Sequence, residues 1–136
     1  MPSVEFDLEH SYPDDPTGGI VLSVELLGTS TVRFPAHVDT GAADCLFQSV
    51  WAELLGLTLQ DGIHKSFSPA GGGSISAFGH DVTLRVLGKT VSSMVYFTDH
   101  PQFRRNVLGR EGWLHHFKFG LVHYDSKLYL GNRGDY

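Results

Sequence analysis

Short runs in which apolar and polar residues alternate recur along the chain and predict a series of β-strands. Residues 4–9 alternate Val, Phe and Leu with acidic residues, so we expect a half-buried strand at a sheet edge. Residues 20–27 and 31–38, separated by a Gly28-Thr29-Ser30 turn, predict a hairpin. Further strands are expected at residues 63–67, 77–87, 89–98, 117–123 and 127–130.

Two short helices are expected among these strands. Ser49 is the predicted N-cap of a helix over residues 50–55 that ends at Gly56, and residues 110–115 predict a second helix. The Gly-rich segment 68–74 lies between two predicted strands, which is typical of a flexible hairpin tip. Since no internal repeat or linker interrupts the pattern, we expect one mostly-β domain over residues 1–136.

Charge and composition narrow the classes of function. The formal net charge is −5 and Arg104-Arg105 is the only dense basic pair, so a nucleic-acid partner is not expected. Cys45 is the only cysteine, which excludes an intrachain disulfide and fits a reducing compartment. The His residues form no zinc-binding motif, so no metal and no other cofactor are expected. The absence of a signal-peptide pattern and of any apolar run of about eighteen residues predicts a soluble, cytoplasmic protein without a membrane partner.

Candidate chemistry is concentrated at the end of the predicted strand 31–38. Val38 leads directly to Asp39, so a carboxylate leaves an apolar strand and enters a tight turn. Thr40 offers a hydroxyl to a neighbouring loop, and Gly41 lets the backbone come close to whatever the carboxylate faces. This arrangement suits acid–base activation of a water molecule. One Asp is a poor catalyst for that purpose, because its ordinary pKa of roughly 4 makes it a weak base and leaves no acid beside it.

The segment Val38-Asp39-Thr40-Gly41-Ala42 resembles the signature of the retroviral-type, or retropepsin-like, aspartic proteases. A second segment, Asn106 to Leu114, resembles the later element of that family, in which an apolar pair is followed by Gly109-Arg110 and a short helix. The two segments agree with the family in order and separation. With the strands between them, the resemblance covers roughly residues 19 to 131.

The resemblance implies a single-lobe acid protease fold with closed, barrel-like β-sheets and one or two short helices. It also implies an aspartic endopeptidase that hydrolyses extended peptide segments, with Asp39 as the catalytic residue. Because the sequence holds one Asp-Thr-Gly only, the second carboxylate would come from a second copy of the chain, so a homodimer is expected. Two carboxylates about 3 Å apart share one proton, and we expect activity at mildly acidic to near-neutral pH.

The resemblance also assigns roles around Asp39. Thr40 would brace the dimer, Gly41 would receive the substrate backbone, and Ala42 cannot hydrogen-bond the carboxylate as Ser or Thr could. The Gly-rich tip would be a flap that closes over the peptide and excludes water. The residues assigned to this flap are Ser68, Pro69, Ala70, Gly71, Gly72, Gly73 and Ser74.

One departure from the family pattern leaves a second function open. Retroviral members carry another Asp directly after Asp-Thr-Gly-Ala, and it pairs with the Arg of the Gly-Arg element; here position 43 is Ala. Asp44 is the candidate to replace it, so Asp44, Gly109 and Arg110 are expected to support the turn. The alternative to the protease is a catalytically inert dimerisation or peptide-binding module of the same fold.

Overall fold

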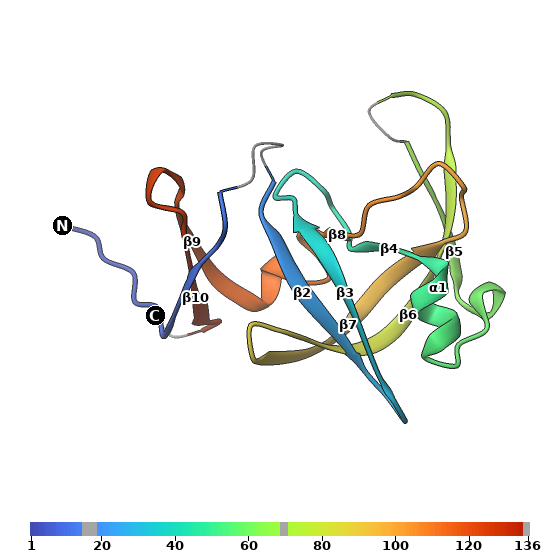
Figure 1. The fold of residues 1–136 in the computed structure, drawn as a ribbon, viewed down its shortest axis with the longest axis horizontal. Helices are drawn as coiled ribbons and strands as arrows, with labels where there is room; N and C mark the ends of the chain where they lie inside the picture. Colours follow the sequence, from blue (N-terminus) through green and yellow to red (C-terminus); the bar gives the residue numbers. More distant parts are fainter. Residues whose placement is uncertain (15–18, 69–70, 135–136) are drawn as a thin grey trace.

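The computed structural model describes residues 1–14, 19–68 and 71–134, and it is mostly β, as predicted (Figure 1). Within these ranges it contains one α-helix, α1 (Ser49–Leu54), and three short 3-10 helices, η1 (Leu59–Asp61), η2 (Leu114–His116) and η3 (His123–Asp125). The strands are β1 (Leu8–Ser11), β2 (Val21–Leu27), β3 (Thr31–Val38), β4 (Leu46–Gln48), β5 (Ile63–Phe67), β6 (Ile75–Val86), β7 (Lys89–Thr98), β8 (Val107–Leu108), β9 (Phe117–Val122) and β10 (Lys127–Asn132).

Seven of these strands form the larger sheet, in the order β2-β3-β8-β4-β7-β6-β5. An additional antiparallel pairing of β2 with β6 joins the sheet back on itself, so the barrel-like closure expected from the sequence is present. Strand β5 remains outside this ring as the partner of β6 in a hairpin. The tip of the hairpin projects at the upper right of Figure 1, above and to the right of the turn that follows β3.

Every second side chain of β2 and β3 is buried, and these side chains form part of the core. Leu22, Val24 and Leu26 of β2 face inward, as do Phe34 and its alternate neighbours in β3, because successive side chains of a strand point to opposite faces. Helix α1 covers one end of this core, where Trp51 stacks on Phe34 with ring centroids 4.9 Å apart. The turn that carries Asp39 is therefore attached to a strand whose alternate side chains are buried in the core.

The predicted bounds of three strands, 31–38, 63–67 and 89–98, are confirmed. The predicted N-cap is wrong: Ser49 is the first helical residue, and Gln48 occupies the cap without a side-chain hydrogen bond. The stop at Gly56 is confirmed. Gly56 has φ +88° and its N–H donates to the Glu53 carbonyl, a backbone conformation that favours glycine.

Two other predicted elements differ from the structure. The strand expected at residues 4–9 begins only at Leu8, because its pairing with β10 starts at Leu8 opposite Leu130, and Val4 and Phe6 remain exposed. The helix expected at 110–115 is a wide turn followed by η2, in which the Leu114 N–H donates to the Gly109 carbonyl. Burial of Trp113 draws this segment into the core instead of along a helix.

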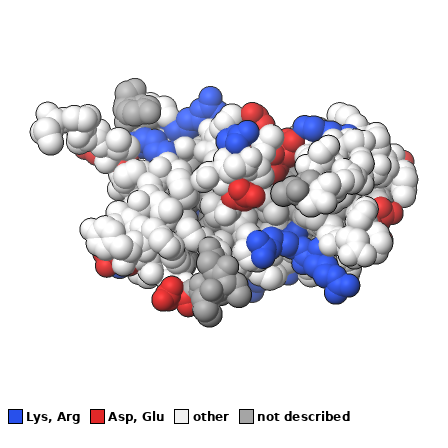
Figure 2. All heavy atoms as spheres, turned by 90° about the horizontal axis from the view of Figure 1, so that it is seen from above, with Lys and Arg blue, Asp and Glu red and all other residues white. Residues whose placement is uncertain are grey.

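The smaller sheet has the order β1-β10-β9 and lies at the left of Figure 1. Strand β10 is therefore covered on both sides by its own chain, whereas β9 pairs with one strand only within the described residues. On the face seen in Figure 2, acidic side chains are dispersed, and Lys and Arg form several separate groups, the most extended of which lies at the lower right. None of the helices in the described ranges has the length and apolar character needed to cross a membrane.

Candidate active site

A cleft of about 580 Å³ separates the turn after β3 from the β5–β6 hairpin. The turn contributes Asp39 and the backbone that follows it, the hairpin contributes the end of β5, and apolar side chains of three other segments close the floor. The lining residues are Asp39, Gly41, Ala42, Ala43, Asp44, Leu46, Lys65, Ser66, Phe67, Ser68, Ile75, Phe103 and Val107. A carboxylate thus faces a mostly apolar groove.

Three backbone hydrogen bonds and one side-chain hydrogen bond fix the position of Asp39. Its N–H donates to the Leu108 carbonyl at 3.0 Å, and its carbonyl accepts from the Ala42 N–H at 3.2 Å. The Val38 N–H just before it donates to the Ile20 carbonyl at 2.9 Å. The carboxylate oxygen Oδ1 accepts from the Gly41 N–H at 2.9 Å, so the turn itself orients the acid. Asp39 remains exposed to solvent in the single chain.

The segment after β8, which contains Gly109 and Arg110, contacts the turn directly. The Arg110 N–H donates to the Ala42 carbonyl at 2.9 Å, and the Glu111 N–H donates to the Ala43 carbonyl at 2.8 Å. Arg110 also donates from Nη1 to the Thr40 carbonyl at 3.0 Å. The backbone of Gly109 packs so closely that an added Cβ would lie 2.2 Å from the Asp44 carbonyl oxygen.

Asp44 does not form the expected pair with Arg110. Its carboxylate oxygen Oδ2 accepts from Lys65 Nζ at 2.6 Å, because its side chain points toward β5 instead of toward the segment after β8. This hydrogen bond is the main reason that the pKa of Lys65 lies above its ordinary value. The same ammonium lies 5.2 Å from the ring centroids of Phe67 and Tyr96. An ion pair therefore connects the turn with the base of the hairpin.

The predicted flap residues lie partly on the cleft. Ser68 lines it, whereas Gly71, Gly72, Gly73 and Ser74 are exposed at the hairpin tip. Gly72 and Gly73 have φ values of +88° and +80°, so glycine suits both positions. Side chains added there would meet nothing within 4 Å, which shows that the described part of the tip stands away from the turn. Pro69 and Ala70 lie outside the described residues.

Several lining residues were missed by sequence reasoning. Lys65 carried one weak signal, a basic residue on the strand that leads to the predicted flap, and Phe67 ends the same strand. Leu46, Phe103 and Val107 carried no signal, because an apolar residue near a turn has the same pattern whether it faces a core or a cleft.

Cys45 is a buried core residue, and its thiol is unreactive. Burial raises the pKa of the Cys45 thiol to about 12, although the Gly109 N–H donates to Sγ at 3.4 Å and acts in the opposite direction. The thiol is therefore protonated at neutral pH and is no nucleophile. Over the described ranges, no three His, Cys, Asp or Glu side chains gather as metal ligands would.

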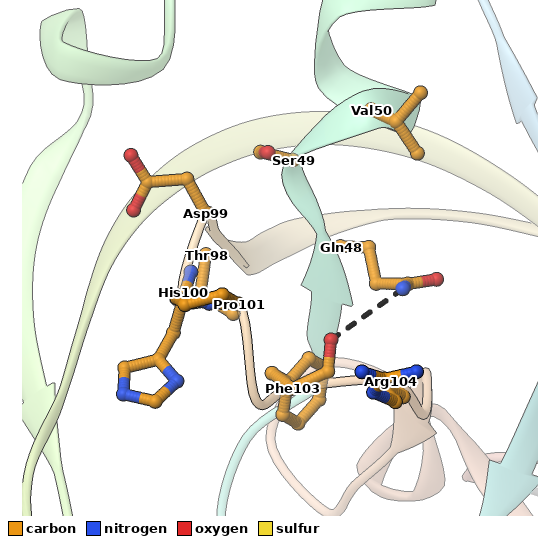
Figure 3. Close-up of a pocket in the computed structure, with 9 residues that line it drawn as sticks. All are labelled: Gln48, Ser49, Val50, Thr98, Asp99, His100, Pro101, Phe103 and Arg104. Carbon is orange, nitrogen blue, oxygen red and sulfur yellow. Dashed lines mark hydrogen bonds between the residues drawn. The ribbon is translucent and has the colours of Figure 1, made fainter.

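A second hollow of about 340 Å³ adjoins the cleft, since Phe103 lines both. Figure 3 shows that Asp99 and His100 lie on one side of this hollow and Arg104 on the other. Gln48 Nε2 donates to the Phe103 carbonyl at 3.4 Å, which connects the loop after β7 to the end of β4. The hollow has a polar lining, unlike the cleft beside it.

Comparison with known proteins gives a match in structure only. No protein-family model matches the chain, and no curated protein matches it. Among solved structures, the crystal structure of a retropepsin-like aspartic protease from Rickettsia conorii is similar, with a TM-score of 0.67 and 21% identity. The match covers 90% of this chain and 98% of that one. The chain therefore has the fold of the retropepsin-like aspartic proteases.

Proposed function

We propose that this chain is an aspartic endopeptidase that acts as a homodimer on extended peptide segments. One observation carries the proposal: the Asp39 carboxylate, oriented by the Gly41 N–H, faces an apolar cleft between its own turn and a hairpin with a Gly-rich tip. Thr40, Gly41 and Ala42 form the turn that presents the acid. The structural likeness to an aspartic protease supports the same assignment.

The cleft of one chain supplies only half of the required chemistry. Its lining contains two carboxylates, and that of Asp44 is already paired with Lys65. The sequence holds no second Asp-Thr-Gly, so the partner of Asp39 must be Asp39 of another copy. In such a pair the ionised carboxylate takes a proton from water while the protonated one polarises the peptide carbonyl. The attack forms a tetrahedral diol, and the pair then returns a proton to the leaving amine.

The substrate would lie extended between the turn and the hairpin. Main-chain hydrogen bonds would hold it, and its side chains would alternate between opposite walls of the cleft. Leu46, Phe67 and Val107 present apolar surface for those side chains. The hairpin tip, from Ser68 to Ser74, would close over the peptide and exclude water. We place this activity in the cytoplasm, since the single, buried Cys45 needs no oxidising compartment.

Strand β9 offers the surface on which two copies would meet. Its outer edge has no strand partner within the described residues, and its sequence Phe-Lys-Phe-Gly-Leu-Val carries only one charge. Edge strands without charges or Pro pair readily with another strand. The opposite edge, β1, is less suitable because Glu9 there is paired with Lys127. Pairing of β9 with β9 of a second copy would extend the small sheet across a two-fold axis.

Leu121→Glu is therefore expected to weaken the dimer. Leu121 lies on β9 and is 44% exposed, so the substitution leaves the core intact while it brings two like charges together across the axis. We expect the dissociation constant, measured by sedimentation equilibrium, to rise by about tenfold. Tyr124→Glu is the matched control, because Tyr124 is 95% exposed on η3, outside the strand. An equal effect of both substitutions, or none from either, would contradict assembly through β9.

Ala43 favours one rival, an inert dimerisation or peptide-binding module. This residue lines the cleft without the carboxylate that the family pattern has there, so the cleft lacks one of the polar groups of that pattern. Incubation of the purified chain with casein at mildly acidic to near-neutral pH separates the two functions. The protease should release peptides at a rate that falls more steeply than the protein concentration on dilution. A dimer that leaves casein intact across this pH range would support the inert module.

A further inference from the structure

Two basic side chains in the loop that follows Phe103 form no ion pair with any described residue. Arg104 and Arg105 are both exposed, and neither contacts a carboxylate in the described part of the chain. Most other cations of the molecule do make such contacts, namely Arg33, Lys65, Arg85, Lys89 and Lys127. Two adjacent, unpaired guanidinium groups are unusual on a chain with a net charge of −5.

These two residues adjoin the proposed path of the substrate. Phe103, the residue before them, lines the cleft together with Asp39 and also lines the neighbouring hollow together with Arg104. Arg104 and Arg105 then line a third hollow of about 420 Å³ beside His37 and Trp51. The three hollows are thus consecutive along one loop. An extended peptide advances about 3.3 Å per residue, so a residue a few positions from the scissile bond would reach the arginines.

The loop that carries the arginines is anchored at both ends. Asn106 is buried, its Nδ2 donates to the Pro35 carbonyl at 3.0 Å, and its Oδ1 accepts from the Gln48 N–H at 2.9 Å and from Trp51 Nε1 at 3.1 Å. At the other end, Thr98 Oγ1 donates to the Ser76 carbonyl at 2.8 Å. The backbone at Arg104 and Arg105 is therefore held in place before any ligand arrives, which lowers the entropy that binding must overcome.

We propose that Arg104 and Arg105 form a subsite for an acidic side chain of the substrate, beyond the residues that contact the catalytic cleft. Arginine suits this role because its planar group binds a carboxylate through two parallel hydrogen bonds. Asp99 is the nearest opposing charge in the hollow, and it lies on the other side from Arg104 (Figure 3). The substrate class is a peptide with Glu or Asp a few positions away from the cleaved bond. This inference rests on the proposed protease function.

Kinetics with matched peptides test the subsite. A casein-derived peptide that the protein cleaves is made with Gln or Glu at each flanking position in turn. For the wild-type protein we expect one position at which Glu raises kcat/KM by about fivefold over Gln, since each exposed ion pair contributes up to that factor. The double variant Arg104→Gln/Arg105→Gln should lose this preference and retain its rate on the Gln peptide. High salt should reduce the preference in the wild-type protein.

Arg33→Gln is the matched control, because Arg33 is exposed and pairs with Glu25 on β2, away from the cleft. It should leave the preference for Glu unchanged. The proposal is overturned if the wild-type protein shows no preference for Glu at any position, or if the double variant keeps it.

A binding measurement separates this inference from the protease function. The Asp39→Asn protein is titrated with fluorescently labelled casein-derived peptides that carry Gln or Glu at each position in turn, whether or not they are cleaved, and anisotropy reports the affinity without cleavage. Tighter binding of the Glu peptide than of the Gln peptide, lost when Arg104→Gln/Arg105→Gln is added, supports the subsite. If this result is obtained and the wild-type protein cleaves nothing, only the protease function fails. Tighter binding of a short single-stranded RNA than of the Glu peptide would overturn the assignment to an acidic peptide.

Discussion

Asp39→Asn is expected to abolish peptide hydrolysis while the fold and the dimer remain. The substitution keeps the size of the side chain and the oxygen that accepts from the Gly41 N–H, but an amide can neither take a proton from water nor give one to the leaving amine. General acid–base catalysis typically contributes about 10²–10⁴-fold, so kcat should fall by that factor. Single-turnover assays on a casein-derived peptide measure the loss, and circular dichroism and sedimentation check the fold and the assembly.

A matched control and a mixing experiment sharpen this test. Asp81→Asn changes an exposed carboxylate on β6 and should leave the rate unchanged. Excess Asp39→Asn protein added to the wild-type protein should inhibit it, because mixed dimers contain one competent carboxylate only. Full activity in the presence of such an excess would mean that Asp39 acts without a second copy. Cleavage that survives in the Asp39→Asn protein alone would assign the activity to another site.

Gly109→Ala is expected to destabilise the protein and the turn that carries Asp39 together. The added Cβ would lie 2.2 Å from the Asp44 carbonyl oxygen, 2.6 Å from the Asp44 carbonyl carbon and 2.9 Å from the Ala42 carbonyl oxygen. All three are backbone atoms, so no side-chain rotation relieves the contact and the turn after Asp39 must shift. Overpacking of this kind costs about 1–3 kcal/mol, and backbone clashes lie at the upper end. Urea denaturation measures the loss, and peptide hydrolysis should fall as well.

Gly71→Ala is the matched control for this substitution. A Cβ at Gly71 would meet nothing within 4 Å, and Gly71 is not among the glycines with positive φ. The same change in covalent structure is therefore expected to be neutral, or to stabilise the protein by up to about 1 kcal/mol through the unfolded state. If Gly109→Ala unfolds at the same urea concentration as the wild-type protein, the close approach of the two backbones at Gly109 has no energetic importance.

Much of the fold could be predicted because the strongest patterns are local. In residues 31–38 and 89–98, apolar and polar residues alternate with the period of two that is typical of a half-buried strand. The errors occurred where tertiary contacts overrule local preference. The start of β1 is set by its pairing with β10, more than a hundred residues away in the sequence. Residues 110–115 form a wide turn instead of a helix because Trp113 is buried in the core.

The candidate site was predictable only where a motif marks it. Asp39, Gly109 and Arg110 belong to two short segments that agree with a family pattern in order and separation, so they could be proposed together. The pair of Asp44 with Lys65 could not be foreseen, because it depends on the direction in which Asp44 leaves an irregular segment and on the proximity of β5. Likewise, Phe103 contributes to two hollows only through the path of its loop, which no periodicity encodes.

The enclosure of β10 between β1 and β9 has a consequence for regulation under the proposed function. Each protomer completes its terminal sheet from its own segments, so it can reach its native state before it meets a partner. Folding would then be a separate event from dimerisation, and a protomer at low concentration would be folded but inactive. Under the proposed function, the concentration of the protomer would then control the rate of proteolysis.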